Sequence, residues 1–352
     1  MIDVYIGGPV ELNIIIQVIY LLNIFLKFIK LFPPEFSHVL ALRCLNIAYK
    51  TGLLKLLFPR PKTANVNFVG MKLTNKLGTA AGLDKNGDYI DCLGALGFGF
   101  LEIGTVTPLP QSGNKKPRVF RVRDELAIIN SLGFNNHGME AMLSNLKSLK
   151  RRGALGINIG PNKNTKFENI LEEYLILYKA FSSHADYITI NISSPNTPGL
   201  RNMHDPQCFE DLIRTISAER STSIDKPKIL IKFSPDENHD TYIKLIEILN
   251  SSDFDGVIIS NTTVDNNLKI KSGATSISGG ISGKLLQDKS NELLVFFKKN
   301  LKPEKIIVAV GGVFDVDSYN KKLDLGADFV QIYTGFVYEG PSLIKRIVQN
   351  GK

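Results

Sequence analysis

The residues best suited to chemistry in this chain lie in segment 191–197, which follows an apolar run at 187–190. The segment holds two carboxamides and a hydroxyl pair, Ser193 and Ser194, and Pro195 stiffens the loop. A hydroxyl can exchange a proton with a substrate when its neighbours activate it, and carboxamides can hydrogen-bond a polar ring. Polar groups at a strand exit usually point into a site, although a Ser/Asn-rich turn that caps the next helix is the alternative.

Seven more apolar runs are followed by polar or glycine-rich residues, so this segment is one of eight. The eight expected strands cover residues 77–81, 99–103, 154–159, 185–191, 227–232, 255–260, 305–310 and 328–333. Helical patterns lie between them, for example at 168–182, 206–219, 240–250, 285–299 and 316–324. This alternation predicts an α/β fold, a closed parallel (β/α)8 TIM barrel with its site at the carboxyl ends of the strands. A doubly wound sheet is the alternative, but that fold does not need eight strands.

The first sixty residues have a different pattern, and two domains are predicted: helices at 1–62 and the barrel at 63–352. Within 12–32, polar positions recur every three or four residues and leave a wide apolar face. Such a helix favours a membrane interface over a membrane crossing, although its length permits a crossing. A second short amphipathic helix is expected at 36–49. A helical subdomain packed on its own globule is the alternative to a docking site for a membrane and a lipid-soluble partner.

Composition narrows the classes of partner. The 352 residues carry a formal charge of +8, with no basic stripe interleaved with aromatic residues, so nucleic acid is not an expected partner. Cys44, Cys92 and Cys208 lie far apart, which argues against a disulfide framework or a metal site.

The start of the chain lacks a basic region or an Arg-rich transit pattern. The expected location is therefore peripheral, on the cytoplasmic face of a bacterial cell membrane, with the mitochondrial inner membrane as the alternative.

Ten sequence blocks in order give a more specific indication. They are AAGLDKNG (80–87), EIGTVTP (102–108), KPRVFR (116–121), NSLGFNN (130–136), LGINIG (155–160), NISSPNTPGLR (191–201), SNTT (260–263), GGISG (279–283), AVGGV (309–313) and QIYTGF (331–336). Together they resemble the dihydroorotate dehydrogenases, specifically the quinone-dependent, membrane-associated class. The resemblance implies an FMN cofactor, oxidation of (S)-dihydroorotate to orotate in pyrimidine biosynthesis, and ubiquinone or menaquinone as electron acceptor. It also implies a monomer whose N-terminal helices meet the membrane surface and lead quinone to the flavin.

The resemblance assigns roles to individual residues. Ser194 would be the catalytic base, where cytosolic relatives have cysteine, and Thr105 could begin a proton relay from it. Substrate would be bound by Lys85, Asn130, Ser131, Leu132, Gly133, Phe134, Asn191, Asn196, Asn261 and Thr262. FMN would be bound by Ala81, Gly82, Leu83, Asp84, Lys85, Thr105, Asn158, Asn191, Lys232, Ser260, Gly283, Gly312, Tyr333 and Thr334. The quinone site would include His38, Arg121 and Tyr333, although His38 could equally be a helix histidine with a structural partner.

Lys232 is a special case, because a buried lysine without a partner is costly. The reduced flavin edge would be its partner, and an ion pair with a neighbouring carboxylate is the alternative. Three other functions remain open at this stage. They are a different FMN barrel acting on dihydropyrimidines or hydroxy acids, a membrane-tethered flavin-binding module without turnover, and a membrane-surface scaffold.

Overall fold

The computed structural model describes residues 28–57, 66–68, 71–149, 153–197 and 199–352. The chain divides into two compact units, residues 1–60 and 61–352. Most of the apolar helix expected at 12–32 lies outside the described residues. No helix in the described part of the chain is long and apolar enough to cross a membrane.

The first unit contains helices α2 (Pro34–Lys50) and α3 (Leu53–Leu57). Proline at the first position of α2 suits a helix start, because that position needs no backbone donor. The helix begins two residues before the expected 36–49. Several large apolar side chains of this unit are solvent-exposed, among them Leu31 at 69% and Ile47 at 62%. An apolar surface of this kind is typical of a docking face.

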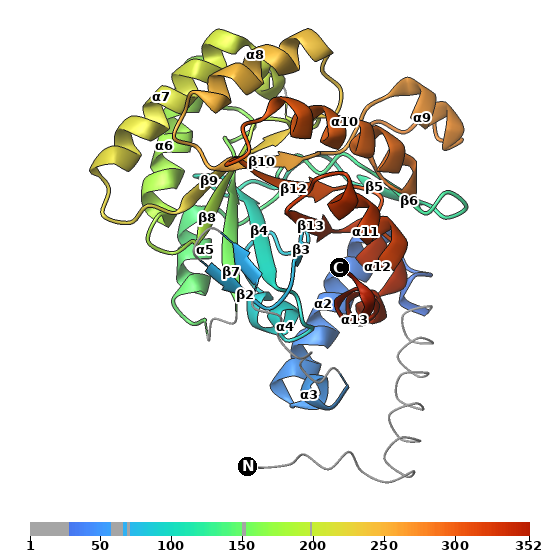
Figure 1. The fold of residues 1–352 in the computed structure, drawn as a ribbon. Coiled ribbons are helices and arrows are strands. Elements are labelled where there is room, and N and C mark those ends of the chain that lie inside the picture. Colours follow the sequence, from blue (N-terminus) through green and yellow to red (C-terminus); the bar gives the residue numbers. More distant parts are fainter. Residues whose placement is uncertain (1–27, 58–65, 69–70, 150–152, 198) are drawn as a thin grey trace. The chain divides into compact units, whose positions relative to one another are not determined.

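The second unit is built on a closed barrel of eight parallel strands (Figure 1). The strands are β3 (Leu77–Thr79), β4 (Phe100–Val106), β7 (Ala154–Ile159), β8 (Tyr187–Asn191), β9 (Lys228–Phe233), β10 (Gly256–Ile259), β12 (Ile306–Val310) and β13 (Phe329–Ile332). The ring closes where β13 pairs with β3. This arrangement confirms the predicted (β/α)8 barrel and excludes the doubly wound sheet.

Helices follow the strands and cover the outside of the barrel (Figure 1). They are α4 (Ile90–Gly94), α5 (Met139–Leu146), α6 (Ile170–Phe181), α7 (Pro206–Thr222), α8 (His239–Asn250), α9 (Asn266–Lys271), α10 (Gln287–Asn300), α11 (Val316–Asp324), α12 (Thr334–Glu339) and α13 (Pro341–Asn350). Each of the five helices expected between strands is present, with ends shifted by no more than a few residues.

Two small antiparallel sheets accompany the barrel. The first pairs β1 (Val66–Phe68) with β2 (Met71–Leu73) in antiparallel register. The second has three strands, β5 (Val119–Val122), β6 (Ala127–Asn130) and β11 (Gly280–Gly283). The sequence pattern did not predict this second sheet. It matters for function, because it places Asn130 directly opposite Gly280 from a distant part of the chain.

An apolar plug fills the barrel interior near the amino ends of the strands. Phe100 meets the rings of Tyr187 and Phe329 edge-on, at centroid distances of 6.3 and 5.9 Å. Glycines leave room for these rings: a Cβ at Gly156 would lie 2.0 Å from the Tyr187 ring. The interior is therefore packed rather than hollow at this level, and open space begins further along the strands.

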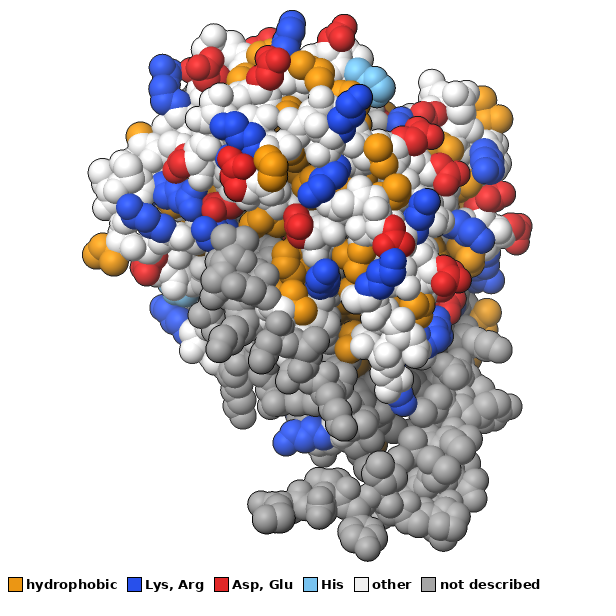
Figure 2. Space-filling model, viewed as in Figure 1, with side chains coloured by type: hydrophobic (Ala, Val, Ile, Leu, Met, Phe, Trp, Pro, Cys, Tyr) orange, Lys and Arg blue, Asp and Glu red, His pale blue; other side chains and the backbone are white. Residues whose placement is uncertain are grey.

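The surface facing the viewer in Figure 2 mixes both signs of charge. Lys and Arg side chains alternate with Asp and Glu over the described part of this face, and no large area of a single sign is visible there. The described part of this face therefore presents no extended field of one sign that would attract a polyion.

Candidate active site

A cavity opens at the carboxyl ends of the barrel strands, where barrel enzymes place their sites. It encloses about 1120 Å³ of empty space, open solvent included. Nineteen of the predicted site residues line it: Ala81, Gly82, Lys85, Thr105, Asn130, Leu132, Gly133, Phe134, Asn191, Ser194, Asn196, Lys232, Ser260, Asn261, Thr262, Gly283, Gly312, Tyr333 and Thr334. The structure thus brings together residues that the sequence scatters over the whole barrel.

One part of the wall, here called the carboxamide end, consists of Asn130, Asn191, Ser194, Asn196 and Asn261. These side chains hold one another in place. The Asn196 amide donates to Asn130 Oδ1 at 3.4 Å, and the Asn261 amide donates to Asn191 Oδ1 at 3.3 Å. Carboxamides carry a donor and an acceptor on one flat group, so this end suits a ring with amide edges.

Ser194 lies in the loop after β8 and is 5% exposed. Its Oγ accepts a hydrogen bond from the backbone N–H of Asn196 at 3.3 Å. The Thr105 hydroxyl instead donates to Asn158 Oδ1 at 2.6 Å. No hydrogen bond joins Ser194 and Thr105 in the described structure, so the predicted relay between them is not formed by direct contact.

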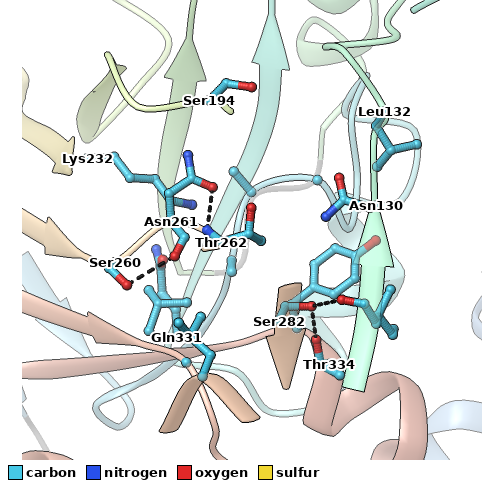
Figure 3. A pocket seen from close by; sticks show the side chains of 18 of the residues that line it. Asn130, Leu132, Ser194, Lys232, Ser260, Asn261, Thr262, Ser282, Gln331 and Thr334 are labelled. Carbon is cyan, nitrogen blue, oxygen red and sulfur yellow. Dashed lines mark hydrogen bonds between the residues drawn. The ribbon is translucent and has the colours of Figure 1, made fainter. Parts of the chain in front are cut away.

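The opposite part of the wall, here called the glycine end, consists of Ser282, Gly283, Gly311, Gly312 and Thr334. In Figure 3, Ser194 lies at one side of the cavity, and Ser282 and Thr334 lie at the other. The two hydroxyls of Ser282 and Thr334 are 2.8 Å apart.

Only glycine fits at position 312. The backbone there has φ +76°, and a Cβ would lie 2.3 Å from Gln287 Cβ. Glycine therefore lets this loop pack closely against Gln287, and glycine-rich turns are a common means of presenting backbone N–H groups to a phosphate.

Two lysines face the same cavity. Lys85 Nζ donates to the Gly82 carbonyl at 3.0 Å. Lys232 is 6% exposed, and its Nζ makes no hydrogen bond or close ion pair with any described residue. Burial lowers the pKa of Lys232, and the Glu102 carboxylate acts in the opposite direction. The alternative of a direct ion pair with a neighbouring carboxylate is therefore wrong for the described residues.

Six predicted residues do not line the cavity: His38, Leu83, Asp84, Arg121, Ser131 and Asn158. Asp84 instead shapes the loop after β3, because its carboxylate accepts from the backbone N–H groups of Asp88 and Tyr89 at 3.0 and 2.8 Å. Burial raises the pKa of Asp84 to about 6. His38 belongs to α2 in the first unit and Arg121 to β5 in the second. The binding roles predicted for these residues stay predictions.

The sequence prediction missed two buried polar residues, Glu102 and Gln331. Gln331 lines the cavity, and its amide donates to Glu102 Oε2 at 2.7 Å. A signal was present in the sequence: Glu102 is two positions after Phe100 in an apolar run. It therefore shares the inward face of the strand with a core residue.

Comparisons with known proteins agree with this geometry. The family model described as "Dihydroorotate dehydrogenase" matches residues 63–351. A protein of Buchnera aphidicola (subsp. Schizaphis graminum) named "Dihydroorotate dehydrogenase (quinone)" is 43% identical over 92% of this chain and 98% of its own length. A protein of Acinetobacter baylyi with the same name is 42% identical over 90% of this chain and 95% of its own length.

Solved structures give the same result. The crystal structure of DHODH from Eimeria tenella in complex with ferulenol has a TM-score of 0.81 and 29% sequence identity, and covers 90% of each chain. The ligand-free type from Eimeria tenella also has a TM-score of 0.81, with 30% identity over 88% of this chain and 92% of that chain.

Proposed function

Since the chain belongs to the dihydroorotate dehydrogenase family, an oxidoreductase family of pyrimidine biosynthesis, we propose that it oxidises (S)-dihydroorotate with FMN as hydride acceptor and a membrane quinone as final electron acceptor. Lys232 is the observation that carries this proposal. Its ammonium group is buried, lines the cavity and has no hydrogen-bond partner among the described residues, so an anionic ligand in the cavity would stabilise its charge beyond the more distant effect of the Glu102 carboxylate. The anionic edge of a reduced flavin is such a ligand.

The residues around the cavity fit FMN in two further respects. The glycine end offers backbone N–H groups and two hydroxyls to a phosphate. Gly82, with φ +94°, adds a stretch of cavity wall without a side chain, against which a flat ring could lie. Bound FMN would supply the acceptor for the hydride of the substrate.

Ser194 is proposed as the base that removes the substrate proton. A serine hydroxyl is a weak base, so it must pass its own proton on or be held as a partial anion. The Asn196 N–H, 3.3 Å from Ser194 Oγ, stabilises negative charge that develops there. The carboxamide end would then orient the flat ring, and Lys85 would bind its carboxylate.

The first unit is proposed to dock on a membrane. Phe28, Leu31, Phe36 and Ile47 are each at least half exposed, and Lys30 lies among them. Exposed apolar side chains with adjacent cations suit the interface of an anionic bilayer. A peripheral location on the cytoplasmic face of a bacterial membrane, with ubiquinone or menaquinone dissolved in that bilayer, is the proposed setting.

Anaerobic mixing tests the proposal directly. The purified full chain is mixed with dihydroorotate while the flavin absorbance is followed, and a short-chain ubiquinone or menaquinone is then added. We expect the visible flavin band to bleach with dihydroorotate and to return with quinone, but not with NAD or fumarate. A colourless protein, or a flavin band that dihydroorotate leaves unchanged, would refute the proposal.

A further inference from the structure

Glu102 is a charged side chain in the interior of the barrel with 0% exposure. It lies one layer beyond the apolar plug, where barrels usually carry bulky apolar residues. Its carboxylate accepts four hydrogen bonds, from Asn158 Nδ2 (2.9 Å), Tyr187 Oη (3.1 Å), Thr189 Oγ1 (3.1 Å) and Gln331 Nε2 (2.7 Å). These donors come from three other strands, β7, β8 and β13. A buried anion with so complete a set of partners indicates a function beyond packing.

We propose that Glu102 is a positioning residue that acts through Lys232 and Asn158: it holds Lys232 as a cation at the cavity wall and fixes the direction of the carboxamides that face the ligand. This inference rests on the proposed flavin function of the cavity. Glu102 touches neither ligand, because it does not line the cavity.

The first part of the argument concerns charge. Glu102 is the charged group whose field acts on Lys232, and it favours the protonated lysine against the effect of burial. The other titratable groups nearby are Tyr187 on β8 and, on the cavity wall, Lys85 and Tyr333. Burial raises the pKa of Tyr187 well above its usual range, so this phenol stays neutral. The neighbouring strand β10 contributes no titratable side chain.

The second part concerns direction. An ionised carboxylate only accepts hydrogen bonds, so Asn158 must turn its amide group toward Glu102. Its Oδ1 then accepts from Thr105 at 2.6 Å and from the Asn191 amide at 3.3 Å.

Asn191 Oδ1 is therefore left to accept from the Asn261 amide at 3.3 Å. One buried carboxylate thus sets the orientation of a chain of polar groups that ends at the cavity wall.

The substitution Glu102→Gln removes the charge and keeps the shape. The amide oxygen can still face Asn158, and the hydroxyls of Tyr187 and Thr189 can rotate to accept from the new amide. The readout is the midpoint potential of the bound flavin, measured by spectroelectrochemistry over a range of pH. In a plot of midpoint potential against pH, ionisation of Lys232 should give an inflection, because a cation beside the flavin favours the anionic reduced form of the flavin.

We expect the inflection to move to lower pH by about one unit or more in Glu102→Gln, because the charge that favours protonated Lys232 is gone. Thr189→Val is the matched control: it deletes one hydrogen bond to Glu102 and keeps the charge, so its inflection should stay in place. An unmoved inflection in Glu102→Gln would overturn the proposal, and so would equal shifts in both variants. Because the potential is measured without dihydroorotate, failure here is distinct from failure of the proposed reaction.

Unfolding provides a second test if Glu102→Gln folds poorly. The cycle of Glu102→Gln, Lys232→Met and the double variant is followed by denaturant unfolding of the flavin-bound full chain. Removing one charge leaves the other buried and uncompensated, whereas removing both does not. We expect the double variant to be more stable than the sum of the single effects, and strict additivity would overturn the proposal.

Discussion

The carboxamide end and the glycine end of the cavity are built in different ways. At the carboxamide end, side chains face the ligand and hold one another by hydrogen bonds, as Asn196 holds Asn130. At the glycine end, the backbone of Gly311 and Gly312 forms much of the cavity wall beside the hydroxyls of Ser282 and Thr334, and side chains behind it hold this backbone by hydrogen bonds. Ser290 Oγ donates to the Gly311 carbonyl at 3.3 Å, and the buried Lys322 donates to Ser290 Oγ at 2.6 Å. We therefore expect substitutions at the carboxamide end to act through the lost functional group, and substitutions of glycine at the glycine end to act through the added side-chain volume.

The largest expected effect is at the carboxamide end. Ser194→Ala should slow flavin reduction by dihydroorotate by about 10²–10⁴-fold, the usual contribution of a positioned base, and should leave flavin binding unchanged. Stopped-flow absorbance under anaerobic conditions measures the rate, and the flavin content of the purified protein measures binding. A loss below about tenfold would argue against Ser194 as the base.

A smaller effect is expected at the glycine end, and it should fall on cofactor binding instead. Gly312→Ala places a Cβ 2.3 Å from Gln287 Cβ at a left-handed backbone position. Relief of this overlap must move the loop, and overpacking of this kind costs about 1–3 kcal/mol, which corresponds to a loss of about 5- to 160-fold in FMN affinity. Fluorescence titration with FMN measures it.

Gly273→Ala is the matched control for that measurement. Position 273 has φ +66°, but a Cβ there would have nothing within 4 Å. This variant carries the same backbone strain without the collision, so its affinity for FMN should remain near that of the parent. Equal losses of FMN affinity in the two variants would mean that the collision with Gln287 is not the cause of the weaker binding.

The smallest effect on activity is expected behind the glycine end, where Lys322 affects stability. Burial lowers the pKa of Lys322 from 10.5 to about 7. Between pH 7 and pH 10.5 the unfolded chain carries a proton on Lys322 that the folded chain does not carry. The contribution of Lys322 to the free energy of unfolding therefore rises with pH over this range. Lys322→Met should therefore stabilise the protein most below about pH 7, by at most about 5 kcal/mol, and the gain should shrink toward pH 10.5.

Urea unfolding at several pH values measures that gain. The exposed neighbour Lys321 provides the control, because Lys321→Met changes the charge by the same amount without removing a buried group. A stability gain in Lys322→Met that does not vary with pH would contradict a lowered pKa for Lys322.

The sequence predicted the barrel well because its signal is repeated. Eight apolar runs alternate with amphipathic helices, and each run ends in polar residues, so no single misjudged boundary changes the conclusion. The sheet of β5, β6 and β11 was missed for the opposite reason. Its strands are four residues long, and β11, one of the two partners of β6, is more than a hundred residues away, so this pairing depends on tertiary structure.

The site was predicted where polar residues stand at or near the carboxyl end of a strand or on the loop after it, and was missed where Glu102 stands deeper inside an apolar strand. Asn196 and Lys85 stand among other polar residues, whereas Glu102 stands between Leu101 and Ile103. Such a position looks like core until the direction of each side chain is known. The four donors that satisfy Glu102 come from distant strands, and no local pattern reveals them.

The closing pair of the barrel has a consequence for how the protein is made. β3 ends at Thr79, and its partner β13 begins only at Phe329. During synthesis the first strand therefore waits for almost the whole chain before its second neighbour emerges from the ribosome. Until then the barrel of strands stays open, and the part of the cavity wall formed by Tyr333 and Thr334 is missing. If the proposed flavin occupies this cavity, its site is therefore complete only when nearly the whole chain has been made.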